Sequence, residues 1–317
     1  MIMKNIANKS VTATITAPDS AARREAQEKQ REAELAEYRK RIKEEQKFLI
    51  EDLHSVGVHV EFVWDLLQPG AIALQPQAIP VLLRHVQLPY SDLTTEGIAR
   101  ALGVKEAQDA WPVLVDVYKK TQEGWGIREP GDTKELRLGA KDGLAVALSD
   151  IVTPQTLGEL ISLARDPTNG NSRILLLGAL QKRRNKNAQV QAALAELIHD
   201  PVLTTQISIW IQWPALVEAY KKAKDSDTEK EPEGRREPRL TVKQRLAVAL
   251  SERVKDDTLD ELISLAKDPI HGESRVFLLK ALRRRRNKSV EVQAMLTELM
   301  QDPLLKKEIA SWPKPRK

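Results

Sequence analysis

A block of 102 residues occurs twice in this chain, and the second copy follows the first without a gap. Trp111 begins the first copy and Trp213 begins the second. Between Trp111 and Leu203, 50 of 93 residues are identical to the residue found 102 positions later. Chance similarity would leave only a handful of identities, so the block is an internal duplication. The two copies are therefore expected to share one fold.

Composition favours helices over sheets for the repeated block. The chain has 317 residues, of which 41% are hydrophobic and only 4% are aromatic. Leu and Ala are good helix formers, whereas a β-sandwich would use more Val, Thr, Tyr and Phe. The helices predicted in the first copy span 107–120, 138–150, 155–165, 171–184, 187–199 and 201–211. The second copy repeats them, so each copy is predicted to contain three antiparallel helix pairs.

The residues that precede the duplication divide into three predicted parts. Residues 1–18 lack a useful periodicity and are predicted to form a disordered tail. Residues 19–56 contain no Gly or Pro and are rich in Ala, Glu, Lys and Arg, which predicts one long charged helix. Residues 57–104 are predicted to supply an N-terminal cap, formed by a short apolar helix at 57–68, and the first helix pair, because the first unit of a repeat array has no neighbour. The two triple units then span 105–212 and 213–317.

A narrow apolar stripe runs along the predicted long helix, at spacings of three, four or seven residues. Its members are Leu35, Tyr38, Ile42, Leu49, Leu53 and Val56. Such a stripe either docks on the repeat array or forms a seam for self-association through residues 35–56. A coiled-coil seam needs about three to four heptads, and this stripe barely reaches that length. The sequence leaves both interpretations open.

The turns between the predicted helices carry a recurring acid and base. An Asp-Pro turn begins at Asp166 and precedes Arg173, and the second copy repeats both at Asp268 and Arg275. In each case a Leu follows the Arg by seven residues. This pattern resembles short HEAT repeats of the phycobilisome-lyase type. The resemblance covers about residues 77–312 and implies an all-α fold, an α-solenoid of stacked antiparallel helix pairs preceded by the long helix.

The acid and the base of these turns also have a role that follows from their chemistry. A carboxylate in a turn and a guanidinium in the first turn of the next helix can hydrogen-bond to helix-end groups and across units. Partly buried pairs of this kind fix register more reliably than they add stability. We therefore interpret Asp166, Arg173, Asp268 and Arg275 as structural positions of the repeat.

No catalytic, cofactor-binding or metal-binding residue is assigned from the sequence. The chain has no Cys, and none of its five His residues pairs with another at i, i+4 or lies beside a matching carboxylate cluster. The two glycine-rich motifs that bind phosphates, G-x-x-x-x-G-K-[ST] and G-x-G-x-x-G, do not occur in the sequence. We expect a protein that is not an enzyme and needs no cofactor. A glycosylase-like or lyase-like HEAT enzyme is the third alternative, without residues to support it.

Membrane association is not predicted either. No run approaches the roughly 18–20 apolar residues needed to span a bilayer. The first residues lack the apolar core of a secretory signal. A cytoplasmic protein is expected.

Two basic runs are the first candidate binding feature. The candidate residues are Arg183, Arg184 and Lys186 in the first copy and Arg285, Arg286 and Lys288 in the second. Such runs can neutralise the phosphates of a nucleic acid or meet an acidic protein. They can equally serve their own fold, because cations at a helix C-terminus meet the negative end of its dipole.

The second candidate is a polar insertion near residues 121–137, whose counterpart spans 223–239. Trp125 and Ile127 lie in the first insertion, and Trp is enriched among interface hot spots. The alternative is that Trp125 folds back on its own scaffold. Taken together, these features predict a non-enzymatic scaffold that binds another protein through an extended solenoid surface. Nucleic-acid binding through the two basic runs is the alternative.

Overall fold

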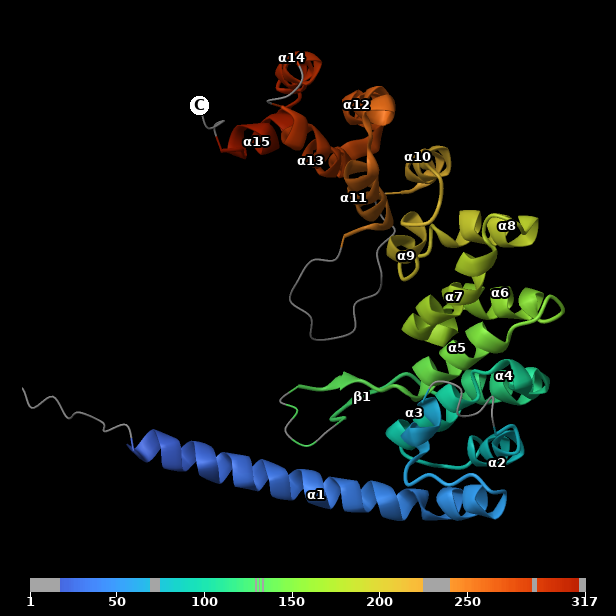
Figure 1. Ribbon diagram of the computed structural model, residues 1–317. Coiled ribbons are helices and arrows are strands. Elements are labelled where there is room, and N and C mark those ends of the chain that lie inside the picture. The colour runs from blue at the N-terminus through green and yellow to red at the C-terminus, as the bar shows by residue number, and fades with distance from the viewer. Residues whose placement is uncertain are drawn as a thin grey trace, which may run out of the picture. The chain divides into compact units, whose positions relative to one another are not determined.

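The computed structural model describes residues 18–68, 75–128, 130, 132, 134–224, 240–286 and 290–313. Within these ranges the chain folds into fifteen α-helices, five short 3-10 helices and one pair of two-residue strands (Figure 1). The predicted all-α class is thereby confirmed. Except for Pro18, the predicted tail lies outside the described residues, as does most of the second insertion.

The chain divides into two compact units. Unit 1 contains Met1–Ala101 and Gly124–Ala140, and unit 2 contains Leu102–Glu123 and Lys141–Lys317. Unit 1 is built from α1 (Pro18–Ser55), η1 (Val63–Leu67), α2 (Ala78–His85), α3 (Asp92–Ala101), β1 (Trp125–Gly126) and β2 (Leu136–Arg137). The short apolar segment predicted to be a helix at 57–68 thus forms a 3-10 helix over its second half.

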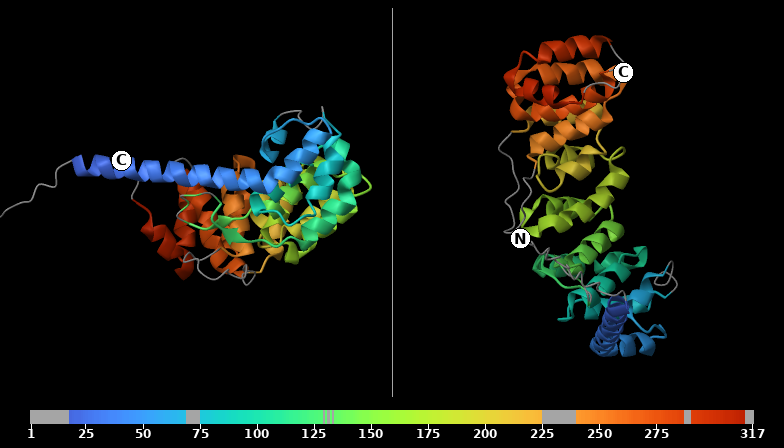
Figure 2. Two further views of the ribbon diagram at one scale, coloured as in Figure 1. Left: turned by 90° about the horizontal axis from the view of Figure 1, so that it is seen from below. Right: turned by 90° about the vertical axis from the view of Figure 1, so that its left-hand side faces the viewer.

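Helix α1 is one continuous helix of 38 residues, as Figure 2 shows from two further directions. The helix ends before Gly57, whose φ of 81° suits glycine. Leu49 and Leu53 are fully buried because this half of α1 packs on α2 and η1. Every described side chain from Arg24 to Glu34 is exposed. The second half of the predicted stripe therefore docks on its own unit.

The remaining helices follow the predicted order closely. They are η2 (Lys105–Ala110), α4 (Trp111–Lys120), α5 (Ala140–Ile151), α6 (Leu157–Arg165), η3 (Pro167–Ser172), α7 (Arg173–Arg183), α8 (Ala188–Leu197), α9 (Thr204–Ser208), α10 (Trp213–Lys222), α11 (Val242–Arg253), η4 (Asp256–Thr258), α12 (Leu259–Lys267), η5 (Pro269–Ser274), α13 (Arg275–Arg285), α14 (Val290–Leu299) and α15 (Pro303–Ser311). In unit 2, helices mostly contact those near them in sequence, such as α6 with α7 and α8. The right-hand view of Figure 2 shows these helices following one another from green to red.

The two copies repeat side-chain contacts as well as helices. The indole Nε1 of Trp111 donates to Glu159 at 2.6 Å, and 102 residues later Trp213 donates to Glu261 at the same distance. The buried hydroxyl of Tyr118 lies 2.8 Å from Ser172 Oγ, and Tyr220 and Ser274 repeat this contact at 2.8 Å. The duplication has therefore preserved polar contacts between helices as well as the apolar core.

None of the helices in the described part of the chain is both long enough and apolar enough to cross a membrane.

Candidate functional site

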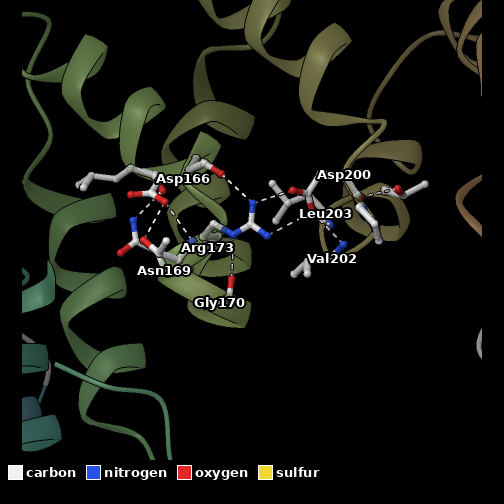
Figure 3. Close-up of polar contacts among 12 residues, drawn as sticks. Asp166, Asn169, Gly170, Arg173, Asp200, Val202 and Leu203 are labelled. Atoms are coloured by element: carbon white, nitrogen blue, oxygen red, sulfur yellow. Dashed lines mark hydrogen bonds and ion pairs between the residues drawn. The ribbon is translucent and has the colours of Figure 1, made fainter. Parts of the chain in front are cut away.

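The Arg that follows each Asp-Pro turn is buried and reaches the next turn (Figure 3). Arg173 is 2% exposed, and its Nη1 lies 2.6 Å from a carboxylate oxygen of Asp200. The same nitrogen donates to the Ala164 carbonyl at 3.2 Å, and Nε donates to the Gly170 carbonyl at 2.8 Å. Gly170 has a φ of 64°, a conformation that favours glycine. Arg173 thus ties the turn before α7 to the turn between α8 and α9.

The second copy repeats this arrangement. Arg275 lies 2.7 Å from Asp302, and its Nε donates to the carbonyl of Gly272, whose φ is also positive. The hydrogen bond from Arg275 lowers the pKa of Asp302. Sequence reasoning missed Asp200 and Asp302 as partners. The available signal was that each stands before a Pro, as Asp166 and Asp268 do.

The acids singled out from the sequence have a more local role. Asp166 accepts hydrogen bonds from the backbone N–H and the hydroxyl of Thr168, at 3.0 and 2.7 Å. These bonds lower the pKa of Asp166. Asp268 likewise accepts from the N–H of Ile270 at 3.0 Å. Each acid therefore caps its own turn, whereas each Arg binds the acid of the next Asp-Pro turn, 27 residues further along the chain.

The basic runs do not act as uniform charged patches. Arg183 Nη2 donates to the Val152 carbonyl at 3.1 Å, and Arg285 Nη2 donates to the Val254 carbonyl at 3.0 Å. These bonds satisfy the carbonyls that follow α5 and α11, which have no partner within the helix. Lys186 is exposed, and Lys288 lies outside the described residues. Two of the six predicted binding residues thus serve their own fold.

The two other arginines of the runs make different contacts. Arg184 Nη1 donates to the Gln181 carbonyl at 2.7 Å. Arg286 Nη2 donates to the Pro313 carbonyl at 2.5 Å. Arg184 in addition lines a cavity of unit 2, which Arg183 does not.

We name this cavity the junction groove, because it lies where the first copy meets the second. It has a volume of about 340 Å³ and is lined by α8 and α10 together with the residues that follow α7 and α9. Leu194, Ile198 and Ala219 are buried and form its apolar part, with Trp210 beside them. Arg184 and Lys222 contribute positive charge. No signal in the sequence alone indicated this groove.

The first polar insertion forms a β-hairpin where a surface loop was predicted. Trp125 pairs with Arg137 and Gly126 pairs with Leu136 in an antiparallel register. Trp125 is 51% exposed and Ile127 is 57% exposed, and Leu136 is 44% exposed. Three large apolar side chains thus lie on one short element, and the two candidates named from the sequence are among them. Leu136 pairs with Gly126, the neighbour of Trp125, so the side chains of Leu136 and Trp125 point to opposite faces of the hairpin.

Two contacts hold the hairpin on the helices of unit 1. The hydroxyl of Tyr38 donates to the Arg128 carbonyl at 2.8 Å. The Arg128 guanidinium lies 2.6 Å from Glu96, which is 4% exposed and also binds Arg100 at 2.8 Å. Because a buried carboxylate with two guanidinium partners is costly to separate, the hairpin is anchored firmly.

A second cavity, of about 350 Å³, lies beside the hairpin within unit 1. Tyr38 and Ile42 of α1 line it together with Ile127 and Leu138. The Arg41 guanidinium lies 5.3 Å from the centre of the Tyr38 ring. We call Trp125, Ile127 and this cavity the hairpin surface.

One polar chain in unit 1 joins a His to a single carboxylate, a pair that the sequence did not indicate. Asp52 lies 2.8 Å from Nε2 of His85, which is 3% exposed, and Nδ1 of His85 lies 2.7 Å from the Tyr90 hydroxyl. The hydrogen bond with His85 lowers the pKa of Asp52. Asp52 and His85 are 33 positions apart in the sequence, which hid this pair.

Among the described residues, no group of three or more His, Asp or Glu side chains is arranged to hold a metal ion. Comparisons with protein-family models, with curated proteins and with solved structures find no match for this chain.

Proposed function

We propose that this protein is a non-enzymatic scaffold that binds another protein, and that the hairpin surface of unit 1 is its main contact site. The observation that carries this proposal is the exposure of Trp125 and Ile127, two residues apart on one anchored element. Folded proteins rarely expose a contiguous group of large apolar side chains unless a partner covers it. Trp is also the residue type most often found at interface hot spots.

The anchoring contacts support the same proposal. The Arg128–Glu96 ion pair and the Tyr38 hydrogen bond fix the hairpin before any partner arrives. A surface that is already ordered loses less conformational entropy on binding, which leaves more free energy for affinity. The neighbouring cavity offers room for an apolar side chain of the partner.

For unit 2 we infer a HEAT-like solenoid of stacked helix pairs. The support is the repetition of contacts between successive units, above all Arg173 with Asp200 and Arg275 with Asp302. In a solenoid each unit contacts only its neighbours, and the array presents an extended surface. Such an array would display further contact sites beside the hairpin surface.

The hairpin surface can be tested with the double variant Trp125→Ala/Ile127→Ala. A matched control is Ile270→Ala, because Ile270 is 76% exposed but lies in unit 2. Tagged full-length chains are incubated with lysate of the source organism, and retained proteins are quantified by mass spectrometry. We expect one or more proteins to be retained by the wild type and the control and lost from the double variant.

Circular dichroism and thermal unfolding should show that both variants fold like the wild type, because the replaced side chains are largely exposed. Equal retention by all three chains would refute the role of the hairpin surface. If no protein is retained under several salt conditions, the scaffold proposal itself fails.

A further inference from the structure

The junction groove is bordered by a helix that differs from its counterpart in the first copy at only three positions. Helices α4 and α10 have ten residues each and match at seven positions. The three differences are Ala215, Glu218 and Ala219 in α10, where α4 has Val, Asp and Val. All three of these α10 residues line the groove. All the differences between α4 and α10 thus lie among the α10 residues that border this cavity.

The substitutions have a direct steric consequence. Each Ala lacks the two methyl groups of the Val that stands at the same position of α4, so the surface beside Ala215 and Ala219 is hollowed. Ile198 and Leu194 of the facing helix are buried at the floor, at 1% and 3% exposure. The cavity of about 340 Å³ falls within the range of ligand pockets, roughly 300–1,000 Å³. The groove has room for a large apolar side chain.

The charges of the groove are unbalanced. Among the described residues, neither Arg184 nor Lys222 has a carboxylate within ion-pair distance, and the described bond of Arg184 goes to the Gln181 carbonyl. The carboxylate of Glu218 lies 3.6 Å from Lys221, which does not line the groove. Two cations on different helices thus border an apolar cavity. An arginine pairs well with carboxylates, so these cations favour an acidic ligand.

We propose that the junction groove binds a peptide segment of another protein in which a large apolar side chain is flanked by Asp or Glu. The apolar side chain fills the space over Leu194 and Ile198, and the acids pair with Arg184 and Lys222. Asn185, Gln191 and Gln212 also line the groove, and their amides suit the N–H and C=O groups of a peptide backbone. The hydrocarbon chain of a fatty acid would offer these amides no hydrogen-bond partner. This inference rests on the proposed scaffold function and specifies the chemistry of a second partner.

The test uses the full-length chain and a phage-displayed library of random dodecapeptides as the probe. The matched variant is Ala215→Val/Ala219→Val, which installs in α10 the residues that α4 already carries at these positions. We expect the wild type to enrich peptides that combine Leu, Ile, Phe or Trp with neighbouring Asp or Glu. Synthetic versions of these peptides, measured by fluorescence anisotropy, should bind the double variant about tenfold more weakly or worse.

A charge reversal separates the acidic requirement from the apolar one. Lys222→Glu should weaken binding of the acidic peptide, and a peptide with Lys in place of its acids should regain affinity for this variant. Lys222 is exposed, so the substitution should leave the fold intact, which circular dichroism can verify. Unchanged binding of the acidic peptide by Lys222→Glu contradicts the proposed pairing.

Three outcomes overturn the proposal. The first is enrichment of the same peptides by the wild type and the groove-filled variant. The second is enrichment of peptides without acids. The third is saturable binding of dodecanoate without any peptide enrichment, which assigns the groove to a lipid.

The variant Trp125→Ala/Ile127→Ala distinguishes this proposal from that of the hairpin surface. It should keep full affinity for the selected peptides while losing the captured partner. Failure of the groove therefore leaves the hairpin surface standing, and failure of the hairpin surface leaves the groove standing.

Discussion

At the residue scale, the buried arginine after each Asp-Pro turn is the clearest structural determinant. Arg173 replaces its water shell by two backbone carbonyls and the carboxylate of Asp200. Removing only the guanidinium leaves these acceptors without their donor in a poorly hydrated site. Breaking one side of a buried pair costs more than the pair itself contributes.

We therefore predict that Arg173→Ala and Arg275→Ala each lower the free energy of unfolding by about 3 kcal/mol, because Asp200 or Asp302 loses its partner. Urea unfolding followed by circular dichroism measures the change. The matched control is Arg165→Ala, whose ion pair with Glu196 is 2.6 Å long but exposed, and it should cost less than about 1 kcal/mol. Equal midpoints for all of these variants would rule out the register role.

His271 is the residue at which the two copies differ in titration behaviour. It is 4% exposed, and among the described residues its Nδ1 has no hydrogen-bond partner. Its equivalent in the first copy is Asn169, whose amide donates to the Leu163 carbonyl at 3.0 Å. Burial, and next the charge of Lys243 on α11, lower the pKa of His271 from its ordinary value of 6.5.

The other charged groups around His271 do not reverse this lowering of its pKa. Asp268 lies 3.9 Å from its Nε2 and raises the pKa, whereas Lys221 on α10 and Arg275 on α13 lower it further. The ring also lies 4.8 Å from that of Tyr220, which is buried. The imidazole is therefore held neutral in the folded chain.

This lowered pKa predicts a loss of stability in mild acid. Below 6.5 the unfolded chain binds a proton at this residue more readily than the folded chain, so stability is full above 6.5 and falls as pH decreases. The chain should therefore be less stable at about pH 5.5 than at neutral pH. His271→Asn, which copies the residue of the first repeat, should remove this part of the loss.

Urea titrations of both chains at about pH 7.5 and about pH 5.5 measure the difference. Asp166 and Asp302, whose pKa values are lowered, lose their contribution to stability only below their ordinary pKa of 3.8. They therefore do not affect the difference in stability between about pH 7.5 and about pH 5.5. An identical pH dependence in the two chains would contradict the assignment to His271.

At the scale of elements, α1 combines two different environments in one helix. Leu49 and Leu53 are buried against α2 and η1, whereas the described side chains from Arg24 to Glu34 are all exposed. The first half holds no apolar stripe that could cover a partner helix. A helix without tertiary contacts is marginal in water even when its residues have good helix propensity.

We predict that hydrogen exchange is at least about tenfold slower at the amides of residues 44–55 than at those of residues 24–34. Exchange followed by mass spectrometry of overlapping peptides measures the ratio at two protein concentrations. Uniform protection along α1 that grows with concentration would instead support self-association through residues 35–56.

The hairpin shows why an element can escape sequence reasoning. Its strands have two residues each, too few for a periodic pattern to reveal. Its position depends on Tyr38, which is 90 residues away from Arg128, and on Glu96, which is 32 residues away. The polar composition of the insertion predicted a surface segment correctly but contained no sign of the pairing.

At the scale of the whole molecule, the duplication carried most of what could be predicted. It identified helices α4 to α15 in order, and the turn pattern singled out Arg173 and Arg275 before their partners were known. The basic runs were less informative, because Arg183 and Arg184 are adjacent in sequence but make different contacts in the structure. One satisfies the Val152 carbonyl and the other borders a cavity.

Helix propensity, apolar spacing and capping residues act over a few positions, so the sequence by itself determined the order and approximate position of the helices and that the second copy repeats the first. Packing decided the rest. Burial of Leu49 assigns the stripe of α1 to its own unit, and Ala219 opens a groove only because Leu194 and Ile198 face it. Such contacts join residues that lie far apart in the chain, and their energies depend on the exclusion of water between surfaces, which exists only once the helices have packed.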